Sequence, residues 1–238
     1  LSIRRQRQMC IRDRDSVQDV TLFAKYTLRA DEMFLNRMIG GTFEGSNDPD
    51  FREKEVLYLI NEKPKRLQTV VQSYSSKSYR YVRYIGPKDS HCNIAEAAFY
   101  TPNDTASLKG KVIGTPGCFQ KDGSHEYTNV FDGDVTTSFD YIEPSGGWSG
   151  LDLGTPKQIG RIVYTPRSYD NYIRSGDDYE LFYCARRNNW KSLGDQRSKA
   201  DSLIYIKIPV NALLLLCNNT RGIQERIFVY TAAEQIWK

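Results

Sequence analysis

The chain has 238 residues, 12% of them aromatic, which is enough for one large or two small domains with real cores. No run approaches the roughly 18 apolar residues that a membrane span needs. The net charge of +4 does not indicate nucleic-acid binding, because residues 1–14 hold five Arg and one Asp. The remainder is neutral, with 28 basic and 28 acidic residues (33 minus 5 and 29 minus 1).

The first 14 residues differ from the rest in more than charge. Residues 9–14, Met-Cys-Ile-Arg-Asp-Arg, resemble the translation of a sequencing-adapter end. They also lack the apolar segment of a secretion signal. We therefore expect residues 1–14 to be an adapter artefact or, alternatively, a natural disordered basic tail. In the first case the natural N-terminus is missing.

Short strands separated by turn residues are predicted along the first half of the chain. Residues 31–37 allow one helical turn, and a strand from residue 42 runs into a polar turn. Further strands are predicted at residues 56–60, 67–72, 79–84 and 94–100. In the strand at 79–84 we expect tyrosines on one face and Arg or Val on the other. Residues 101–107, rich in Pro, Asn, Asp and Ser, are typical of a linker.

The second half continues the same pattern without a helical period. Strands are predicted at residues 111–113, 150–153, 160–164, 179–184, 190–193, 203–208, 213–217 and 226–230. Regular short strands with Gly, Pro and Asn between them predict an all-β antiparallel sandwich or jelly roll. Residues 94–100 and 224–230 share a pattern of Glu, apolar residues, Phe and a final Tyr. We therefore expect a complete module at residues 103–238, preceded by a partial one at residues 15–102.

The cysteines do not indicate a zinc site. Apart from Cys10 they form no C-x-x-C pair, and the chain has only two histidines. Cys184 and Cys217 each end an apolar strand, so they either face each other or stay free thiols.

The most distinctive turn lies in residues 129–154. Asp132-Gly133-Asp134 is followed by Thr136 and Thr137, before a Gly-Gly-Trp turn and an alternating strand. Such an oxygen-rich turn suits calcium, which takes six to eight oxygen ligands. It also suits an Asx turn, in which the aspartates bond their own backbone, and spacing alone favours this second interpretation.

Together these segments resemble the discoidin family, also called the coagulation factor five/eight type C domain, whose fold is a galactose-binding-like jelly-roll β-sandwich. In the second half the resemblance rests on residues 130–139, 147–154, 162–167 and 179–183. In the first half it rests on residues 45–48, 79–84 and 94–100. Modules at the C-termini of secreted Bacteroides-type proteins are the most similar. The chain departs from the family in having Phe139 where a tryptophan is usual, and in its aliphatic residues 209–217.

The resemblance implies a structural calcium ion. Asp132 would supply a carboxylate, Asp134 a backbone carbonyl and Thr137 its hydroxyl and carbonyl, while Glu225 would reach the ion from the last strand. Glu96 corresponds to Glu225 in the partial module, where no acidic turn is visible. The resemblance also implies an extracellular, cell-surface or periplasmic bacterial protein, with an upstream glycosidase or transglutaminase-like domain in the same polypeptide.

No catalytic constellation is visible. The chain lacks a G-x-S-x-G elbow, an H-E-x-x-H motif and a phosphate-binding Gly loop. Asp177 and Asp178 are adjacent on a strand and point to opposite faces. We therefore predict a non-catalytic accessory module that binds carbohydrate, because sugars are held by aromatic platforms and planar polar side chains. The candidate ligand-binding residues lie in loops: His125, Tyr141, Trp148, Arg167, Tyr169, Asn171 and Tyr172.

Alternatives remain open for several of these residues and for the function. Trp148 is equally well a core anchor, and Arg167 a buried salt-bridge partner. The alternative function is a structural or protein-interaction sandwich that supports the upstream domain. In that case residues 213–216 would mark a domain face instead of a central strand. Phospholipid binding would require an exposed apolar spike ringed by Lys and Arg, which the sequence does not indicate.

Overall fold

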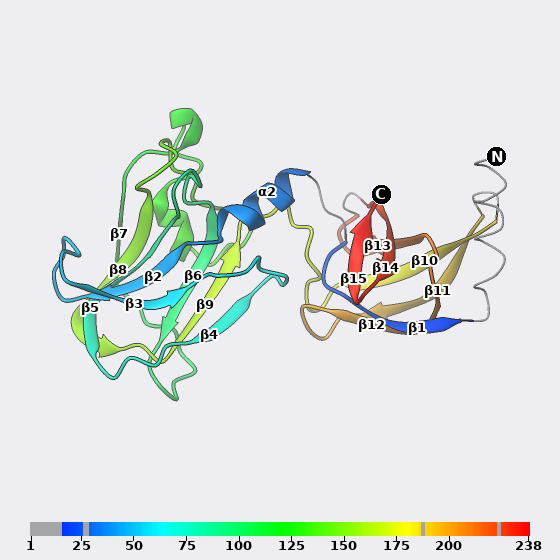
Figure 1. The fold of residues 1–238 in the computed structure, drawn as a ribbon, viewed down its shortest axis with the longest axis horizontal. Coiled ribbons are helices and arrows are strands. Elements are labelled where there is room, and N and C mark those ends of the chain that lie inside the picture. The colour runs from blue at the N-terminus through cyan, green and yellow to red at the C-terminus, as the bar shows by residue number, and fades with distance from the viewer. Residues whose placement is uncertain (1–15, 26–28, 187–188, 223–224) are drawn as a thin grey trace. The chain divides into compact units, whose positions relative to one another are not determined.

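The computed structural model describes residues 16–25, 29–186, 189–222 and 225–238. The chain is nearly all β and forms two compact units (Figure 1). The larger unit spans residues 28–170, and the smaller unit combines residues 1–27 with residues 171–238. The predicted all-β sandwich class is confirmed, and the sheets are antiparallel. Residues 1–14, on which the artefact hypothesis bears, lie outside the described residues. Within the described residues, no helix has the length and apolar character needed to cross a membrane.

The larger unit pairs a five-stranded sheet, in the order β3-β2-β5-β8-β7, with a three-stranded sheet, β4-β9-β6. The first sheet contains β2 (Thr42–Ser46), β3 (Lys54–Leu59), β5 (Ser78–Ile85), β7 (Lys111–Gly114) and β8 (Trp148–Gln158). The second contains β4 (Thr69–Gln72), β6 (Ile94–Tyr100) and β9 (Arg161–Pro166). Side chains from both sheets form one core, including Phe43, Val82, Tyr84, Phe99, Leu151, Ile162 and Tyr164. Helix α2 (Arg29–Arg37) and the short helices η1 (Phe119–Lys121) and η2 (Tyr127–Phe131) complete this unit.

The compact units do not divide the chain at the predicted boundary between residues 102 and 103. β5, which precedes that boundary, pairs with β8, which follows it. β6 likewise pairs with β9, from Ile94 opposite Pro166 to Tyr100 opposite Arg161. The polar residues 101–107 are therefore a loop inside one sandwich, since the strands on both sides of it share the same two sheets. The loop is held locally, because the Leu108 amide donates to the Phe99 carbonyl at 2.7 Å.

Strand β5 corrects a second expectation, because its tyrosines do not share one face. The pairing with β8 shifts register between Tyr79 and Tyr81. This bulge breaks the two-residue period of the strand. Tyr79 and Tyr84 therefore both reach the core, whereas Tyr81, between them, packs against Phe51 instead. Arg83 instead lies 4.0 Å from the centre of the Phe51 ring and 2.7 Å from the carboxylate of buried Glu44.

The smaller unit has its own core between two sheets. Its five-stranded sheet, β11-β10-β13-β14-β15, contains β10 (Asp178–Arg186), β11 (Asn189–Arg197), β13 (Leu214–Asn218), β14 (Ile227–Thr231) and β15 (Glu234–Trp237). The other sheet pairs β1 (Val17–Leu22) with β12 (Leu203–Pro209). The weak patterning of the first residues hid β1 from the sequence. The core is mainly aliphatic and includes Val20, Leu22, Leu181, Leu203, Leu214, Leu216 and Phe228.

The aliphatic residues 213–216 form part of a central strand. β13 lies between β10 and β14, and both Leu214 and Leu216 are buried. The pairing of β10 with β13 places Cys217 opposite Glu180, while the Cys184 amide donates to the Leu213 carbonyl. The two cysteines therefore do not face each other across the ladder, and both are free thiols.

Candidate functional site

The acidic turn is closed by its own side chains. The Asp132 carboxylate accepts hydrogen bonds from the Asp134 amide at 2.7 Å and from the Thr137 hydroxyl at 2.8 Å. The Asp134 carboxylate accepts from the amide and hydroxyl of Thr136 at 2.9 and 2.6 Å. Gly133 has a φ of 85°, a left-handed conformation that favours glycine. The interpretation as an Asx turn is therefore confirmed.

Apolar contacts hold this turn against strand β6. The helix η2 runs directly into the turn, and its Val130 is fully buried in the larger core. Phe131 stacks on Phe99 of β6, with ring centres 6.4 Å apart. On the other side of the turn, the Phe139 amide donates to the Ile94 carbonyl at 2.8 Å. The turn is thus fixed at both ends to the strand that carries Glu96.

Glu96 is the carboxylate that meets the acidic turn. Its carboxylate accepts a hydrogen bond from the Gly133 amide at 2.9 Å and also bonds the Asp132 side chain. Burial, followed by the contact with Asp132, raises the pKa of the Glu96 carboxyl to about 8. Two carboxylates in one small site repel each other, so ionisation of both is disfavoured. A bound cation would offset this repulsion.

The predicted metal ligands are divided between the two units. Asp132, Asp134 and Thr137 lie together in the turn of the larger unit. Glu225 belongs to the smaller unit, two residues before β14, where its carboxylate contacts the Cys217 thiol. The structure thus brings Glu96, from the same unit, to the acidic turn. Among the described residues, no three His, Cys, Asp or Glu side chains gather as a metal site, so a cation at the turn would need hydroxyl and carbonyl oxygens as well.

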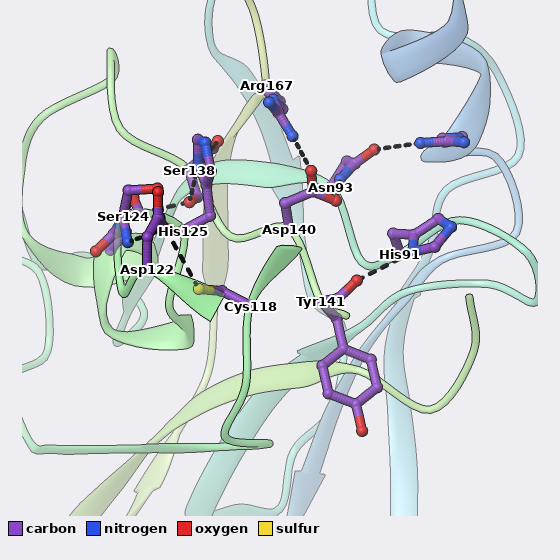
Figure 2. Close-up of polar contacts among 12 residues, drawn as sticks. His91, Asn93, Cys118, Asp122, Ser124, His125, Ser138, Asp140, Tyr141 and Arg167 are labelled. Atoms are coloured by element: carbon purple, nitrogen blue, oxygen red, sulfur yellow. Dashed lines mark hydrogen bonds and ion pairs between the residues drawn. The ribbon is translucent and has the colours of Figure 1, made fainter. Parts of the chain in front are cut away.

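Arg167, a predicted sugar ligand, is instead part of a buried polar network (Figure 2). Its guanidinium bonds the Asp140 carboxylate at 2.5 Å and lies 4.4 Å from the centre of the Phe34 ring. The other Asp140 oxygen accepts from the Asn93 amide at 2.6 Å, and Asn93 in turn accepts from Arg37 at 3.0 Å. Arg167 and Asp140 are each nearly nine-tenths buried, so the salt-bridge alternative for Arg167 is the one that the structure supports.

Four ring side chains lie on three segments that are joined through the backbone around Asp140: His91, Phe119, His125 and Tyr141, here called the ring cluster. The Asp140 amide donates to the His125 carbonyl at 3.1 Å, and the Asp140 carbonyl accepts from the Phe119 amide at 2.8 Å. The Tyr141 amide donates to the His91 carbonyl at 2.7 Å. Figure 2 shows the Tyr141 ring turned away from the buried network.

Within the ring cluster, each histidine has a defined partner. His91 Nδ1 lies 3.0 Å from the Tyr141 carbonyl oxygen, so it carries the proton in the neutral ring and leaves Nε2 as an acceptor. His125 Nδ1 lies 3.3 Å from the Ser138 carbonyl oxygen. Phe119 is 49% exposed. The next two residues, Gln120 and Lys121, both have positive φ values, 67° and 59°. Sequence reasoning missed Phe119 because an isolated phenylalanine in a polar loop carries no pattern.

The remaining predicted ligand residues each have their own surroundings within their units. Trp148 packs against Phe51 with ring centres 5.7 Å apart, as a core anchor would. Tyr169 is 48% exposed and lies beside Phe34. Asn171 and Tyr172 belong to the smaller unit and are buried there. Of the seven predicted residues, only His125 and Tyr141 share the ring cluster.

Comparison with family models, curated proteins and solved structures gives no match to this chain.

Proposed function

We propose that the chain is a non-catalytic carbohydrate-binding protein and that the ring cluster of its larger unit contacts the glycan. The observation that carries this proposal is the exposed phenyl ring of Phe119. Two left-handed non-glycine residues follow it, and such conformations cost of order 1–3 kcal/mol each and occur preferentially at ligand sites. An exposed ring on a segment that is joined through the backbone to those of Tyr141 and the two histidines offers a stacking surface together with hydrogen-bonding groups.

A calcium ion at the acidic turn is part of the same proposal. Asp132, Thr137 and Glu96 supply oxygen atoms of the kind that calcium prefers, and Asp134 adds its carbonyl. The segment that follows the turn leads within a few residues to Asp140 and Tyr141. A cation there would hold this segment against β6 and would thereby fix one side of the ring cluster. Its contribution is structural, because binding to the folded state alone adds to folding stability.

The wider context remains that of the discoidin resemblance. The pairing of a five-stranded with a three-stranded antiparallel sheet supports a jelly-roll, galactose-binding-like fold for the larger unit. We propose an extracellular or periplasmic module of a larger bacterial polypeptide, with the upstream domain as its partner. The alternative is a structural sandwich that presents that domain and binds no sugar.

Glycan binding can be tested with the whole chain on a glycan array, followed by calorimetry with any sugar retained. Phe119→Ala should weaken binding about tenfold, the effect of removing an interface anchor worth somewhat more than 1 kcal/mol. Tyr169→Ala is the matched control, because Tyr169 has nearly the same exposure but lies outside the ring cluster. Retention of full affinity by Phe119→Ala would contradict the assignment of the site. Absence of any glycan binding would favour the structural alternative.

A further inference from the structure

The larger unit contains an open depression at the start of β5, away from the ring cluster. Its volume is about 430 Å³, within the range of small-molecule sites. It is lined by Gly45, Ser46, Asn47, Asp48, Glu53, Lys54, Glu55, Lys77 and Tyr79. β5 runs from this depression to the loop that carries His91, and its eight residues span roughly 25 Å at about 3.3 Å per residue. A ligand here would thus be separate from one at the ring cluster.

At the depression, the ring of Tyr79 is packed against a glycine. A Cβ atom at Gly45 would lie 2.6 Å from the Tyr79 ring, so only glycine allows this contact. Tyr79 is 4% exposed, and its hydroxyl lies 2.7 Å from the Ser75 hydroxyl. These contacts fix Tyr79 and Gly45 against each other, so this part of the depression is rigid.

One wall is the turn between β2 and β3, which is fixed by its own hydrogen bonds. The Asn47 side chain donates to the Ser78 carbonyl at 3.0 Å and accepts from the Arg80 amide at 2.9 Å. The Asp48 carboxylate accepts from the amides of Asp50 and Arg52 at 3.0 and 3.2 Å. A wall that is ordered before the ligand arrives lowers the entropy that binding must supply.

The lining also carries charged groups that remain accessible to water. Lys77 donates to the Glu55 carboxylate at 2.8 Å, and its side chain is 73% exposed. An ammonium group has three N–H donors, so one bond to Glu55 leaves others for a ligand.

The charges of the lining decide the class of ligand. Three carboxylates (Asp48, Glu53 and Glu55) face two ammonium groups (Lys54 and Lys77), and each lysine is already paired with a glutamate. The net lining charge is therefore −1, which disfavours phosphate, sulfate or a uronic acid. Donors and acceptors that are both charged and close together suit the hydroxyl groups of a neutral sugar, each of which both donates and accepts.

We propose that this depression is a second sugar site, which binds a neutral hexose ring through the Glu55–Lys77 pair. The inference shares its ligand class with the proposed function, but it shares none of its residues. Two sites on one rigid sandwich would let the chain bind a polymer or a glycan-covered surface more tightly than either site alone.

The test is an NMR titration of the intact chain with galactose, glucose and mannose, and with glucuronic acid as the anionic comparison. We expect shifts at Gly45, Asn47 and Lys77 with a neutral sugar, and much weaker ones with glucuronic acid. Lys77→Met should raise the dissociation constant obtained from these shifts about tenfold, the typical effect of removing a hydrogen bond from a charged donor. Lys199→Met, which replaces an exposed lysine of the smaller unit, is the matched control.

The two sites can fail independently. If Phe119→Ala removes every sugar-dependent shift, the second site is overturned and the ring cluster stands. If Lys77→Met removes every shift, the depression is the sugar site, and the proposal that the ring cluster binds sugar is overturned. A preference for glucuronic acid over neutral sugars would overturn the ligand class, and no shift at the depression with any sugar would overturn the site itself.

Discussion

The two units carry the same short sequence pattern in different surroundings. In the larger unit Glu96 lies on β6 and meets the Gly133 amide and the Asp132 carboxylate. In the smaller unit Glu225 precedes β14 and meets the Cys217 thiol, whose pKa burial and the nearby carboxylate raise to about 12. Both strands bury their phenylalanines, Phe99 and Phe228, completely. The apolar pattern thus sets which face is buried, whereas the chemistry of the glutamate depends on the distant segment that packs beside it.

The largest expected effect tests whether the two units are separate folding units. Gly150 of β8 lies so close to β5 that a Cβ atom would sit 2.2 Å from the Val82 carbonyl oxygen. Gly150→Ala should therefore cost about 3 kcal/mol or more, because backbone atoms on both strands must move. Hydrogen exchange resolved by residue should show loss of protection in β5 and β8, while β10 and β13 keep theirs.

The matched control for that substitution lies in the smaller unit. Gly194 has a φ of 110°, and no neighbouring atom lies within 4 Å of the position that a Cβ atom would take, so Gly194→Ala meets backbone strain but no clash. It should cost about 1 kcal/mol and affect the smaller unit only. Equal loss of protection in both units after either substitution would show that they unfold as one cooperative body.

Sequence predicted the strands well because burial of alternate residues is a local property. It also predicted the acidic turn, since Asp-Gly-Asp-x-x-Thr brings its own hydrogen-bonding partners within six residues. It could not identify the glutamate beside that turn, because residues 94–100 and 224–230 have nearly the same pattern. The choice depends on long-range packing, in which Phe131 meets Phe99 and Phe139 pairs with Ile94. The misplaced boundary after residue 102 has the same origin, because a polar loop inside a sandwich has the composition of a linker.

An intermediate effect is expected from calcium, and it distinguishes the two glutamates. An ion held at 100 times its dissociation constant stabilises the folded state by about 2.7 kcal/mol, which corresponds to a rise of roughly 5 °C or more in melting temperature for a unit of this size. Chelation should reverse that rise in the wild type and in Glu225→Gln. Glu96→Gln should abolish most of it, as should Asp132→Ala. Calorimetry with and without chelator measures the difference.

Two outcomes would change the assignment of the cation. A chelator-sensitive melting temperature in Glu96→Gln that is lost in Glu225→Gln would restore the ligand set implied by the family resemblance. A melting temperature that calcium never changes, in any variant, would leave the acidic turn as an Asx turn alone.

The smallest expected effect is the pH dependence of the cation-free protein. The pKa of Glu96 is raised to about 8 in the folded state from its ordinary value of 4.5, mainly by burial and then by Asp132. The stabilisation that comes from its protonated form is therefore complete below about pH 4.5 and is lost as the pH rises through 8. Since Glu96 is partly exposed, water screens the effect, and we expect it to be no more than about 1 kcal/mol. Glu225→Gln serves as the control, because it leaves Glu96 in place.

In chelator, denaturant unfolding of the larger unit should show wild-type stability falling between about pH 5 and pH 8.5, with a flatter profile in Glu96→Gln. At high pH, calcium should make the wild type more stable than Glu96→Gln, which is the reverse of their order in chelator. The reason is that the ion requires the ionised carboxylate and displaces its proton. Calcium affinity should therefore increase from about pH 6 to pH 8.5 in the wild type. A calcium affinity that stays constant over this range would show that Glu96 does not bind the ion, even if chelation lowers the melting temperature.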